Sequence, residues 1–224
     1  MQPYLFPYIG YWQLINIVDT FVIYDDVNFI KRGFINRNNL LNNKQSKLFT
    51  LELKGASQNK MINEIEIGNN KEKILKTIQY NYSKAPHFNE VFLLIESIFE
   101  NPTESLSVFV GDSLKKISKY LGITTSFLYS SSLEHNKTLK AEDRLIEICK
   151  TLNAREYINT IGGIDLYNKS GFKREGITLS FIKPEQFDYK QFNHNYIGNL
   201  SIIDVMMFNS KRKISEILEK YILV

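Results

Sequence analysis

The sequence predicts an α/β protein with a mainly parallel sheet in three layers, flanked by helices and carrying a helical middle segment. β-prone runs alternate along the chain with segments of helical periodicity, which is typical of this class. The run Phe21-Val22-Ile23-Tyr24 is continuous, as in a strand buried on both faces. Hydrophobic residues make up 43% of 224 residues, enough for a sizeable core. We therefore expect a single α/β domain over residues 1–224, in which 71–122 form the helical middle segment.

The first third of the chain predicts one helix and several short strands. Pro3 and Pro7 keep the first residues extended. Apolar residues then recur three apart from Ile9 to Val18, so we expect a helix over 8–18. The strand 21–24 follows it, and β segments are expected over 28–30, 48–53 and 61–67.

The remainder of the chain predicts mostly helices. They are expected over 71–84, 88–99, 104–121, 138–152, 164–169, 201–210 and 213–222. Pro86 ends the first of these, and Gly122 is a C-terminal cap for the third. Strands are expected over 124–129, 156–159 and 177–182.

Composition excludes several function classes. The net charge of +4, from 28 basic and 24 acidic side chains, is too small to demand nucleic acid, so we expect no DNA partner. The single cysteine, Cys149, excludes an intramolecular disulfide and a cysteine zinc site, and its place on an apolar helix face favours a buried structural thiol. The three histidines lie far apart without metal-ligand spacing, so we expect no metal and no cofactor.

The sequence also predicts a cytoplasmic location. The first residues lack the cationic and long apolar regions of a signal peptide. No apolar run reaches the roughly 18 residues of a membrane span, so no span is expected.

Two carboxylates, Asp25 and Asp26, directly follow the predicted strand 21–24. In open α/β sheets ligands gather beyond the carboxyl ends of strands, so both are catalytic candidates. If the strand continues, its alternation lets only one of them face a given pocket. That carboxylate would contact hydroxyls or an amine, or act as a general base. The alternative is that one aspartate caps the following turn.

A polar, cationic segment comes next and predicts an anion-binding face. Arginine offers a planar fork to phosphate, lysine offers a point charge, and asparagine suits sugar hydroxyls and amides. The alternative is a solvated basic loop. The residues concerned are Asn28, Lys31, Arg32, Asn36, Arg37 and Asn38.

The opening segment supplies the other predicted ligand contacts. Free N–H groups at the start of the first helix suit an anion, and a glycine permits close approach of the backbone. Tyrosine rings suit a sugar or a base, although core packing is the ordinary role of such rings. The candidates are Gln2, Tyr4, Tyr8, Gly10 and Tyr24. His135 is a weaker candidate for a general base, with a surface or capping role as the alternative.

Together these motifs resemble the WbqC-like protein family over nearly the whole chain. The resemblance is carried by Gln2-Pro3-Tyr4 with Phe6-Pro7-Tyr8-Ile9-Gly10-Tyr11, by residues 21–29, by Lys31-Arg32 and by Ile35-Asn36-Arg37-Asn38. Later stretches also match: Gly162-Gly163 with Tyr167, Tyr189-Lys190-Gln191-Phe192, and Leu200-Ser201-Ile202-Ile203-Asp204. Members are encoded in bacterial O-antigen and other surface-polysaccharide clusters, and a glycine-transferring role onto an amino sugar has been suggested for them. Members often have a short β segment ahead of the Gln-Pro motif that helps to position it, whereas this sequence starts at Met1.

The resemblance implies an enzyme that transfers an aminoacyl group, glycyl in particular, to the amine of a nucleotide-linked or lipid-linked amino sugar. The donor would be a charged tRNA or a carrier-protein thioester. One alternative is a nucleotidyltransferase-like enzyme, because Tyr8-Ile9-Gly10-Tyr11 is weakly similar to a His-x-Gly-His phosphate site. Another is a non-catalytic binding or scaffold protein of a glycan biosynthesis complex. The sequence leaves the oligomeric state open.

Overall fold

The computed structural model describes residues 1–134, 137–192 and 195–224. The fold is mixed α/β, as predicted, but the described strands form small separate sheets instead of one mainly parallel sheet. Two pairings are parallel: β1 (Thr20–Ile23) with β6 (Ser126–Tyr129), and β7 (Glu156–Thr160) with β8 (Thr178–Pro184). The antiparallel partners are β2 (Arg37–Asn42) with β3 (Gln45–Thr50), β4 (Leu53–Lys54) with β5 (Glu66–Ile67), and β9 (Tyr221–Leu223) with β8.

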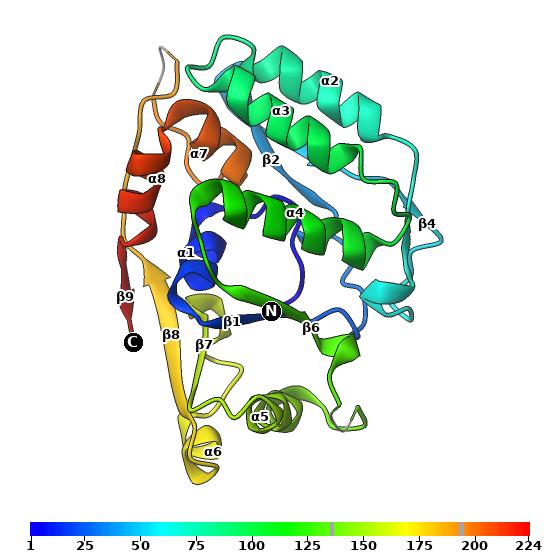
Figure 1. The fold of residues 1–224 in the computed structure, drawn as a ribbon, viewed down its shortest axis with the longest axis vertical. Coiled ribbons are helices and arrows are strands. Elements are labelled where there is room, and N and C mark those ends of the chain that lie inside the picture. The colour runs from blue at the N-terminus through cyan, green and yellow to red at the C-terminus, as the bar shows by residue number, and fades with distance from the viewer. Residues whose placement is uncertain (135–136, 193–194) are drawn as a thin grey trace.

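Helix α1 (Ile9–Ile17) lies at the centre of the molecule (Figure 1). Every residue from Ile9 to Ile15 is buried, because the helix packs against β7 and β8 on one side and against α8 (Lys211–Leu218) on another. A helix that is apolar around its whole circumference needs such enclosure. Its N-cap is Tyr8, so the predicted helix is confirmed to within a residue at each end.

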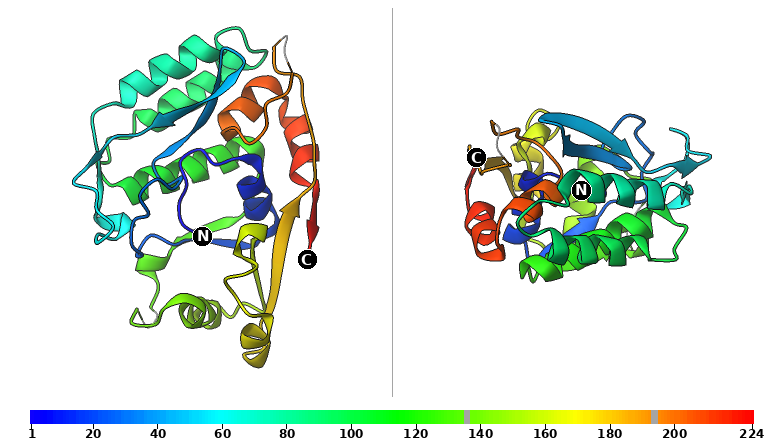
Figure 2. Two further views of the ribbon diagram at one scale, coloured as in Figure 1. Left: turned by 180° about the vertical axis from the view of Figure 1, so that it is seen from behind. Right: turned by 90° about the horizontal axis from the view of Figure 1, so that it is seen from above.

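The middle segment forms a layer of three helices, α2 (Lys71–Tyr82), α3 (Phe88–Phe99) and α4 (Leu106–Leu121). Ser105 caps the start of α4 by accepting from the Val108 N–H, and Gly122 ends it at a φ of 77°. The β2–β3 hairpin lies on the face of α2 and α3 turned away from the viewer in Figure 1, as Figure 2 shows.

A second apolar cluster lies at the opposite end of the molecule from α2 and α3 (Figure 1). It joins α5 (Ala141–Thr151) and α6 (Lys169–Arg174) to β8 through Leu145, Cys149, Phe172, Leu179 and Phe181. Helices α7 (Ile202–Phe208) and α8 close the C-terminal side. Three short 3₁₀ turns connect elements: η1 (Ile62–Glu64), η2 (Ser130–Ser132) and η3 (Ile161–Gly163).

Five of the predicted elements differ from the structure. The segment 48–53 is divided, because β3 ends at Thr50 and β4 begins at Leu53. The segment 28–30 forms only an isolated bridge from Asn28 to Met61, and η1 interrupts 61–67. The helix expected over 164–169 begins later, at Lys169, because Asn168 caps it by accepting from the Ser170 N–H. The helix expected over 213–222 ends at Leu218, and the last residues join β8 as β9.

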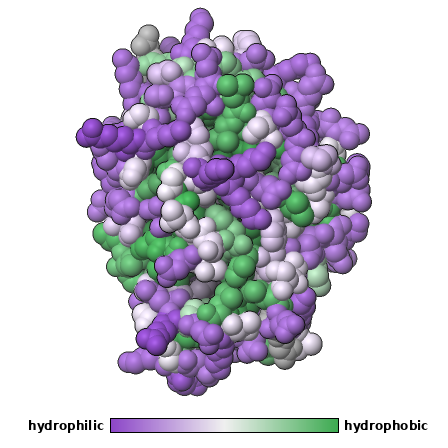
Figure 3. Space-filling model, viewed as in Figure 1, coloured by the Kyte–Doolittle hydropathy of each residue, from purple (hydrophilic) through white to green (hydrophobic). Residues whose placement is uncertain are grey.

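Polar side chains line the outline of the molecule in Figure 3, and apolar ones gather toward the middle of that face. Over the described ranges, no helix is both long enough and apolar enough to cross a membrane.

Candidate functional site

The Asp25 carboxylate is buried among serines at the carboxyl ends of β1 and β6, with 2% of the residue exposed. Its Oδ2 accepts from Ser107 Oγ of α4 and from Ser131 Oγ, each at 2.9 Å. Its Oδ1 accepts from the Ser131 N–H at 3.1 Å and lies 3.2 Å from Ser130 Oγ. Because these donors come from α4 and η2, Asp25 joins both elements to the end of β1.

Asp26 forms a buried ion pair with Arg144 of α5. The Oδ2 to Nη2 distance is 2.6 Å, and the two side chains are 5% and 8% exposed. Arg144 also donates to the Asp26 carbonyl at 3.1 Å, and its guanidinium lies 5.0 Å above the Tyr24 ring. This pair ties α5 to the segment that follows β1.

The condition under which strand alternation would separate the two aspartates is not met. Strand β1 ends at Ile23, so neither carboxylate belongs to the strand. Ser130 Oγ lies within hydrogen-bonding distance of both Asp25 and Asp26, so both side chains point to the same side of the backbone. Each is enclosed by partners, and neither lines the two cavities described below.

In the predicted anion-binding segment, some side chains form hydrogen bonds to backbone carbonyls and others are exposed to solvent. Arg37 donates through Nε to the Gly33 carbonyl at 2.9 Å and through Nη2 to the Arg32 carbonyl. Lys31 and Arg32 are exposed, and Arg32 has a φ of 63°. Of the three cations, Lys31 and Arg32 are therefore the ones whose exposure suits an anion.

The three asparagines of this segment are also placed by the structure. Asn36 donates to the Leu51 carbonyl at 2.7 Å, which fixes the loop against the chain that follows β3. Asn38 is buried and donates to the carbonyls of Leu5 and Phe6 at 3.0 and 2.9 Å. Asn28 is exposed. Asn38 thus organises the backbone of the N-terminal motif, residues 2–11, whereas Asn36 holds its own loop.

The N-terminal motif packs mainly on itself. Tyr4 stacks on Tyr11 at 5.4 Å between ring centroids, and the Tyr11 hydroxyl donates to the Gln2 carbonyl at 2.7 Å. Burial raises the pKa of Tyr4 and of Tyr8. A Cβ at Gly10 would lie 2.5 Å from the Tyr8 ring and 2.8 Å from Pro184, so packing requires this glycine. Since the Tyr8 ring and Pro184 cover Gly10, the similarity to a His-x-Gly-His phosphate site gains no support.

A cavity of about 660 Å³ lies beyond the carboxyl end of β8 and beside the start of α1; we call it the tyrosine cavity. Tyr8, Phe187, Tyr189 and Tyr196 supply its aromatic lining, and the rings of Tyr189 and Tyr196 are 5.0 Å apart. Its polar lining includes Glu185, Gln186, Asp188 and Asn199.

Hydrogen bonds behind the tyrosine cavity fix its lining. The buried Asp204 accepts from the Tyr189 hydroxyl and from Gln191 Nε2, each at 2.6 Å, and from the Tyr82 hydroxyl at 2.9 Å. Burial and the nearby carboxylates of Asp204 and Asp188 raise the pKa of Tyr196. The Tyr196 hydroxyl therefore remains protonated at neutral pH and can donate to a ligand, whereas the Tyr189 hydroxyl already donates to Asp204.

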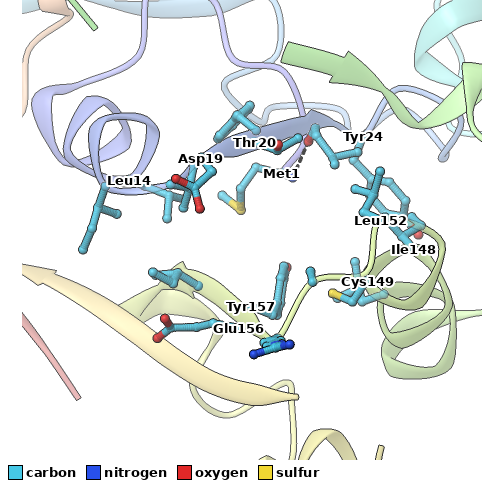
Figure 4. A pocket seen from close by; sticks show the side chains of 18 of the residues that line it. Met1, Leu14, Asp19, Thr20, Tyr24, Ile148, Cys149, Leu152, Glu156 and Tyr157 are labelled. Atoms are coloured by element: carbon cyan, nitrogen blue, oxygen red, sulfur yellow. Dashed lines mark hydrogen bonds between the residues drawn. The ribbon is translucent and has the colours of Figure 1, made fainter. Parts of the chain in front are cut away.

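A second cavity, of about 500 Å³, lies between β1, β7 and α5 (Figure 4); we call it the Met1 groove. Tyr24 and Cys149 are among its lining residues. Cys149 is a free, buried cysteine whose pKa is raised to about 11 by burial, which confirms a buried thiol at this position.

The structure does not gather the predicted site residues into one pocket. Tyr8 lines the tyrosine cavity, Tyr24 lines the Met1 groove, and Asp25 and Asp26 line neither. His135 lies outside the described residues. Within the described ranges, no group of three or more histidine, cysteine, aspartate or glutamate side chains is placed to hold a metal ion.

The predicted site residues do not point to the two stretches that build most of the tyrosine cavity, residues 184–189 and 196–200. A usable signal is present in them: Phe187, Asp188, Tyr189 and Tyr196 bring aromatic and acidic side chains together after a clear strand. Ligand sites favour that position in α/β proteins.

Comparisons with known proteins give one family and one relative. The model of the WbqC-like protein family matches residues 2–216. Rv1507c, an uncharacterized protein of Mycobacterium tuberculosis (strain ATCC 25618 / H37Rv), is 28% identical over 214 residues, which cover 93% of this chain and 91% of the relative. No solved structure matches the chain.

Proposed function

Because this chain belongs to the WbqC-like protein family, we propose that it is an enzyme of bacterial surface-polysaccharide (O-antigen) biosynthesis. Its proposed reaction is the transfer of an aminoacyl group, glycyl in particular, to the amine of a nucleotide-linked or lipid-linked amino sugar. A charged tRNA or a carrier-protein thioester would supply the acyl group. The observation that supports this function most is the tyrosine cavity with its acidic lining.

The chemistry of the tyrosine cavity suits an amino sugar. Aromatic faces pack against the C–H face of a sugar ring, and amide and hydroxyl groups exchange hydrogen bonds with its hydroxyls. Asp188 and Glu185 are exposed carboxylates on the cavity lining, where they complement a protonated amine. The volume of about 660 Å³ lies within the ordinary range for small-molecule sites.

The proposed reaction forms an amide bond between the sugar nitrogen and the acyl carbon. The bond from that carbon to the tRNA oxygen or carrier sulfur breaks, and the leaving group departs with a proton. The sugar ammonium must first lose a proton to become nucleophilic. We assign this proton to Asp188, because Asp25 and Asp26 are enclosed by hydrogen bonds and an ion pair.

The exposed cations of the N-terminal region are proposed to hold the phosphates of the sugar carrier. Lys31 and Arg32 lie in the loop that also contains Phe34. The Phe34 ring lies 6.1 Å from Tyr4, and the Tyr4 hydroxyl contributes to the raised pKa of Tyr8 in the tyrosine cavity. Phe34 and Tyr4 thus link the cation loop to Tyr11 of α1, and the tyrosine cavity lies beside the start of this helix.

A non-catalytic binding role is the second candidate. It is favoured by the enclosure of Asp25 and Asp26, which leaves the carboxylates that follow β1 without access to either cavity. In that case the tyrosine cavity would bind the same class of sugar without transferring a group to it.

The test combines binding and transfer. Purified protein is titrated calorimetrically with a UDP- or dTDP-linked amino sugar, then incubated with a glycyl donor and examined for the added glycyl mass. Tyr196→Ala should weaken binding at least tenfold, and Tyr80→Ala, whose residue is 76% exposed on α2, should not. Asp188→Asn should abolish transfer while binding persists.

The outcomes separate the candidates. Binding that depends on Tyr196, with no transfer from any donor, supports the non-catalytic role. Equal binding by both tyrosine variants removes the tyrosine cavity from the function, and no binding by the unaltered protein contradicts both candidates.

A further inference from the structure

Two loops that lie apart in the sequence are joined through their backbones. The Phe29 N–H donates to the Lys60 carbonyl at 2.9 Å, and an isolated antiparallel bridge joins Asn28 to Met61. These contacts fix the position of one loop relative to the other. We call them the paired loops, which comprise residues 27–34 and 57–62.

The pairing turns two apolar side chains outward on the same face. Phe29 and Ile62 are buried, whereas Ile30 and Met61 are 50% and 43% exposed. In an antiparallel pair, opposite residues share a face, and successive residues of each segment alternate between the two faces. Since Asn28 is opposite Met61, Ile30 lies on the outward face together with Met61.

A tight turn carries cations next to this apolar face. The Gly33 N–H donates to the Ile30 carbonyl at 3.3 Å, and Arg32 has a left-handed φ of 63°. Arg37 donates to the carbonyls of Arg32 and Gly33, so the turn is held in place without a ligand. The side chains of Lys31 and Arg32 are exposed at its tip.

The surface of the paired loops is therefore both apolar and cationic. Phe34 follows the turn and is 45% exposed, which adds a third apolar side chain. Lys60 precedes Met61 and adds a third exposed cation. The paired loops contain no aspartate or glutamate. Their charge is positive throughout, although the chain as a whole has nearly as many acidic as basic side chains.

This combination fits the surface of a bilayer that contains anionic phospholipid. Lysine and arginine are attracted to the lipid phosphates, and apolar side chains enter the boundary between headgroups and acyl chains. Glu64, the acidic residue that follows the second loop, is engaged by the Met61 N–H at 2.8 Å. A soluble polyanion would pair with the cations but would leave Ile30 and Met61 in water. A bilayer uses both parts of the surface.

We propose that the paired loops dock the protein reversibly on a bilayer rich in anionic phospholipid. Three apolar side chains enter the headgroup region and three cations face the lipid phosphates: Ile30, Phe34 and Met61, and Lys31, Arg32 and Lys60. Docking itself does not require the proposed reaction. It also selects a lipid-linked over a nucleotide-linked amino sugar, a step that rests on the proposed function, because the phosphates of a lipid carrier lie at the same surface.

Vesicle co-sedimentation tests the docking with the purified protein and without any sugar or acyl donor, so its result is separate from that of the proposed function. One set of vesicles is an equal mixture of phosphatidylcholine and phosphatidylglycerol, and the other is phosphatidylcholine alone. The protein should bind the mixed vesicles and not the neutral ones. Binding should fall when salt is raised from about 0.1 M to about 1 M, which shortens the range of charge attraction from about 10 Å to about 3 Å.

Variants test the cations first. Lys31→Gln and Arg32→Gln should each weaken binding about fivefold, which corresponds to about 1 kcal/mol for each cation near an anionic surface. Lys73→Gln, at an exposed position of α2, is the matched control and should bind as the unaltered protein does. No binding to the mixed vesicles, or equal binding by all three variants, would overturn the proposal.

The apolar side chains are tested in the same assay. Ile30→Ser should weaken binding about threefold, because about half of this side chain is available to enter the bilayer. Leu93→Ser, at a residue 64% exposed on α3, is the control and should have no effect. Melting temperatures check that each variant folds, and Met61→Ser replaces Ile30→Ser if that variant does not. Binding that depends on the cations but not on Ile30 or Met61 would assign the surface to a soluble polyanion and overturn the proposal.

Discussion

The Met1 amino group makes the stability of the protein depend on pH in a defined window. Burial lowers its pKa to about 5 from an ordinary value of 8.0. Between these values the unfolded chain binds a proton there and the folded chain does not, so the free energy of unfolding rises with pH. This stabilisation is complete above pH 8 and is lost as the pH falls toward 5. At about 1.36 kcal/mol for each pKa unit, the loss is at most about 4 kcal/mol.

Urea unfolding at pH 5, 6, 7 and 8 measures this effect, with an N-terminally acetylated chain as the control. Acetylation abolishes the titration and keeps one N–H for the Val22 carbonyl. The free chain should be less stable than the acetylated chain at pH 5, and the difference should shrink as the pH rises to 8. Groups common to both chains cancel in this comparison. Parallel stability curves, or an amino group that titrates near 8 in the folded protein by NMR, would refute the reasoning.

Three further predictions concern the fold around the site, each measured as the free energy of unfolding in urea. Arg144→Met should lower the free energy of unfolding by about 3–5 kcal/mol, because it leaves the buried Asp26 carboxylate without its cation. Adding Asp26→Asn should restore most of this stability. Equal losses in the single and double variants would contradict this. Gly10→Ala should lower the free energy of unfolding by about 1–3 kcal/mol, whereas Gly162→Ala should be near neutral because open space surrounds that position. The same loss at both positions would contradict the tight packing of Tyr8 and Pro184 on Gly10. Tyr82→Phe should lower the free energy of unfolding by about 1–3 kcal/mol, because the Tyr82 hydroxyl accepts a hydrogen bond from the Leu41 N–H. An unchanged free energy of unfolding would show that this hydrogen bond contributes little.

Much of the helical part of this fold could be predicted from the sequence. The helix 88–99 matches α3 at both ends, and Gly122 ends α4 as expected. These segments carry an apolar stripe and local end signals, which are the features that periodicity detects. Local information sufficed because each helix satisfies its own backbone hydrogen bonds.

The strands are harder to predict from the sequence, because strand pairing depends on contacts between segments that lie far apart in the chain. The sequence does not predict strand β2, because Asn38, Asn39 and Asn42 are of a residue type depleted in strands and indicate a polar loop. The pairing of β2 with β3 and the hydrogen bonds from Asn38 to the N-terminal motif offset this low strand propensity. Within the described residues, four small sheets stand where the sequence predicts one mainly parallel sheet.

The candidate site shows the same division. Proximity in sequence put the aspartates, cations and tyrosines of the opening stretch into one expected pocket. The chain instead turns Asp25 and Asp26 toward the serines of η2 and directs Tyr8 to the tyrosine cavity. That cavity depends on residues 184–189 and 196–200, which lie far along the chain. Only the three-dimensional arrangement could bring these parts together.

Cys149 gives the protein a built-in kinetic reporter. With a pKa of about 11, roughly one thiol in a thousand is ionised at pH 8, and the residue is buried. Alkylating reagents should therefore label Cys149 slowly while the fold is intact and rapidly once the chain is unfolded. The labelling rate then measures how well the packing around α5 protects this thiol, without any engineered probe.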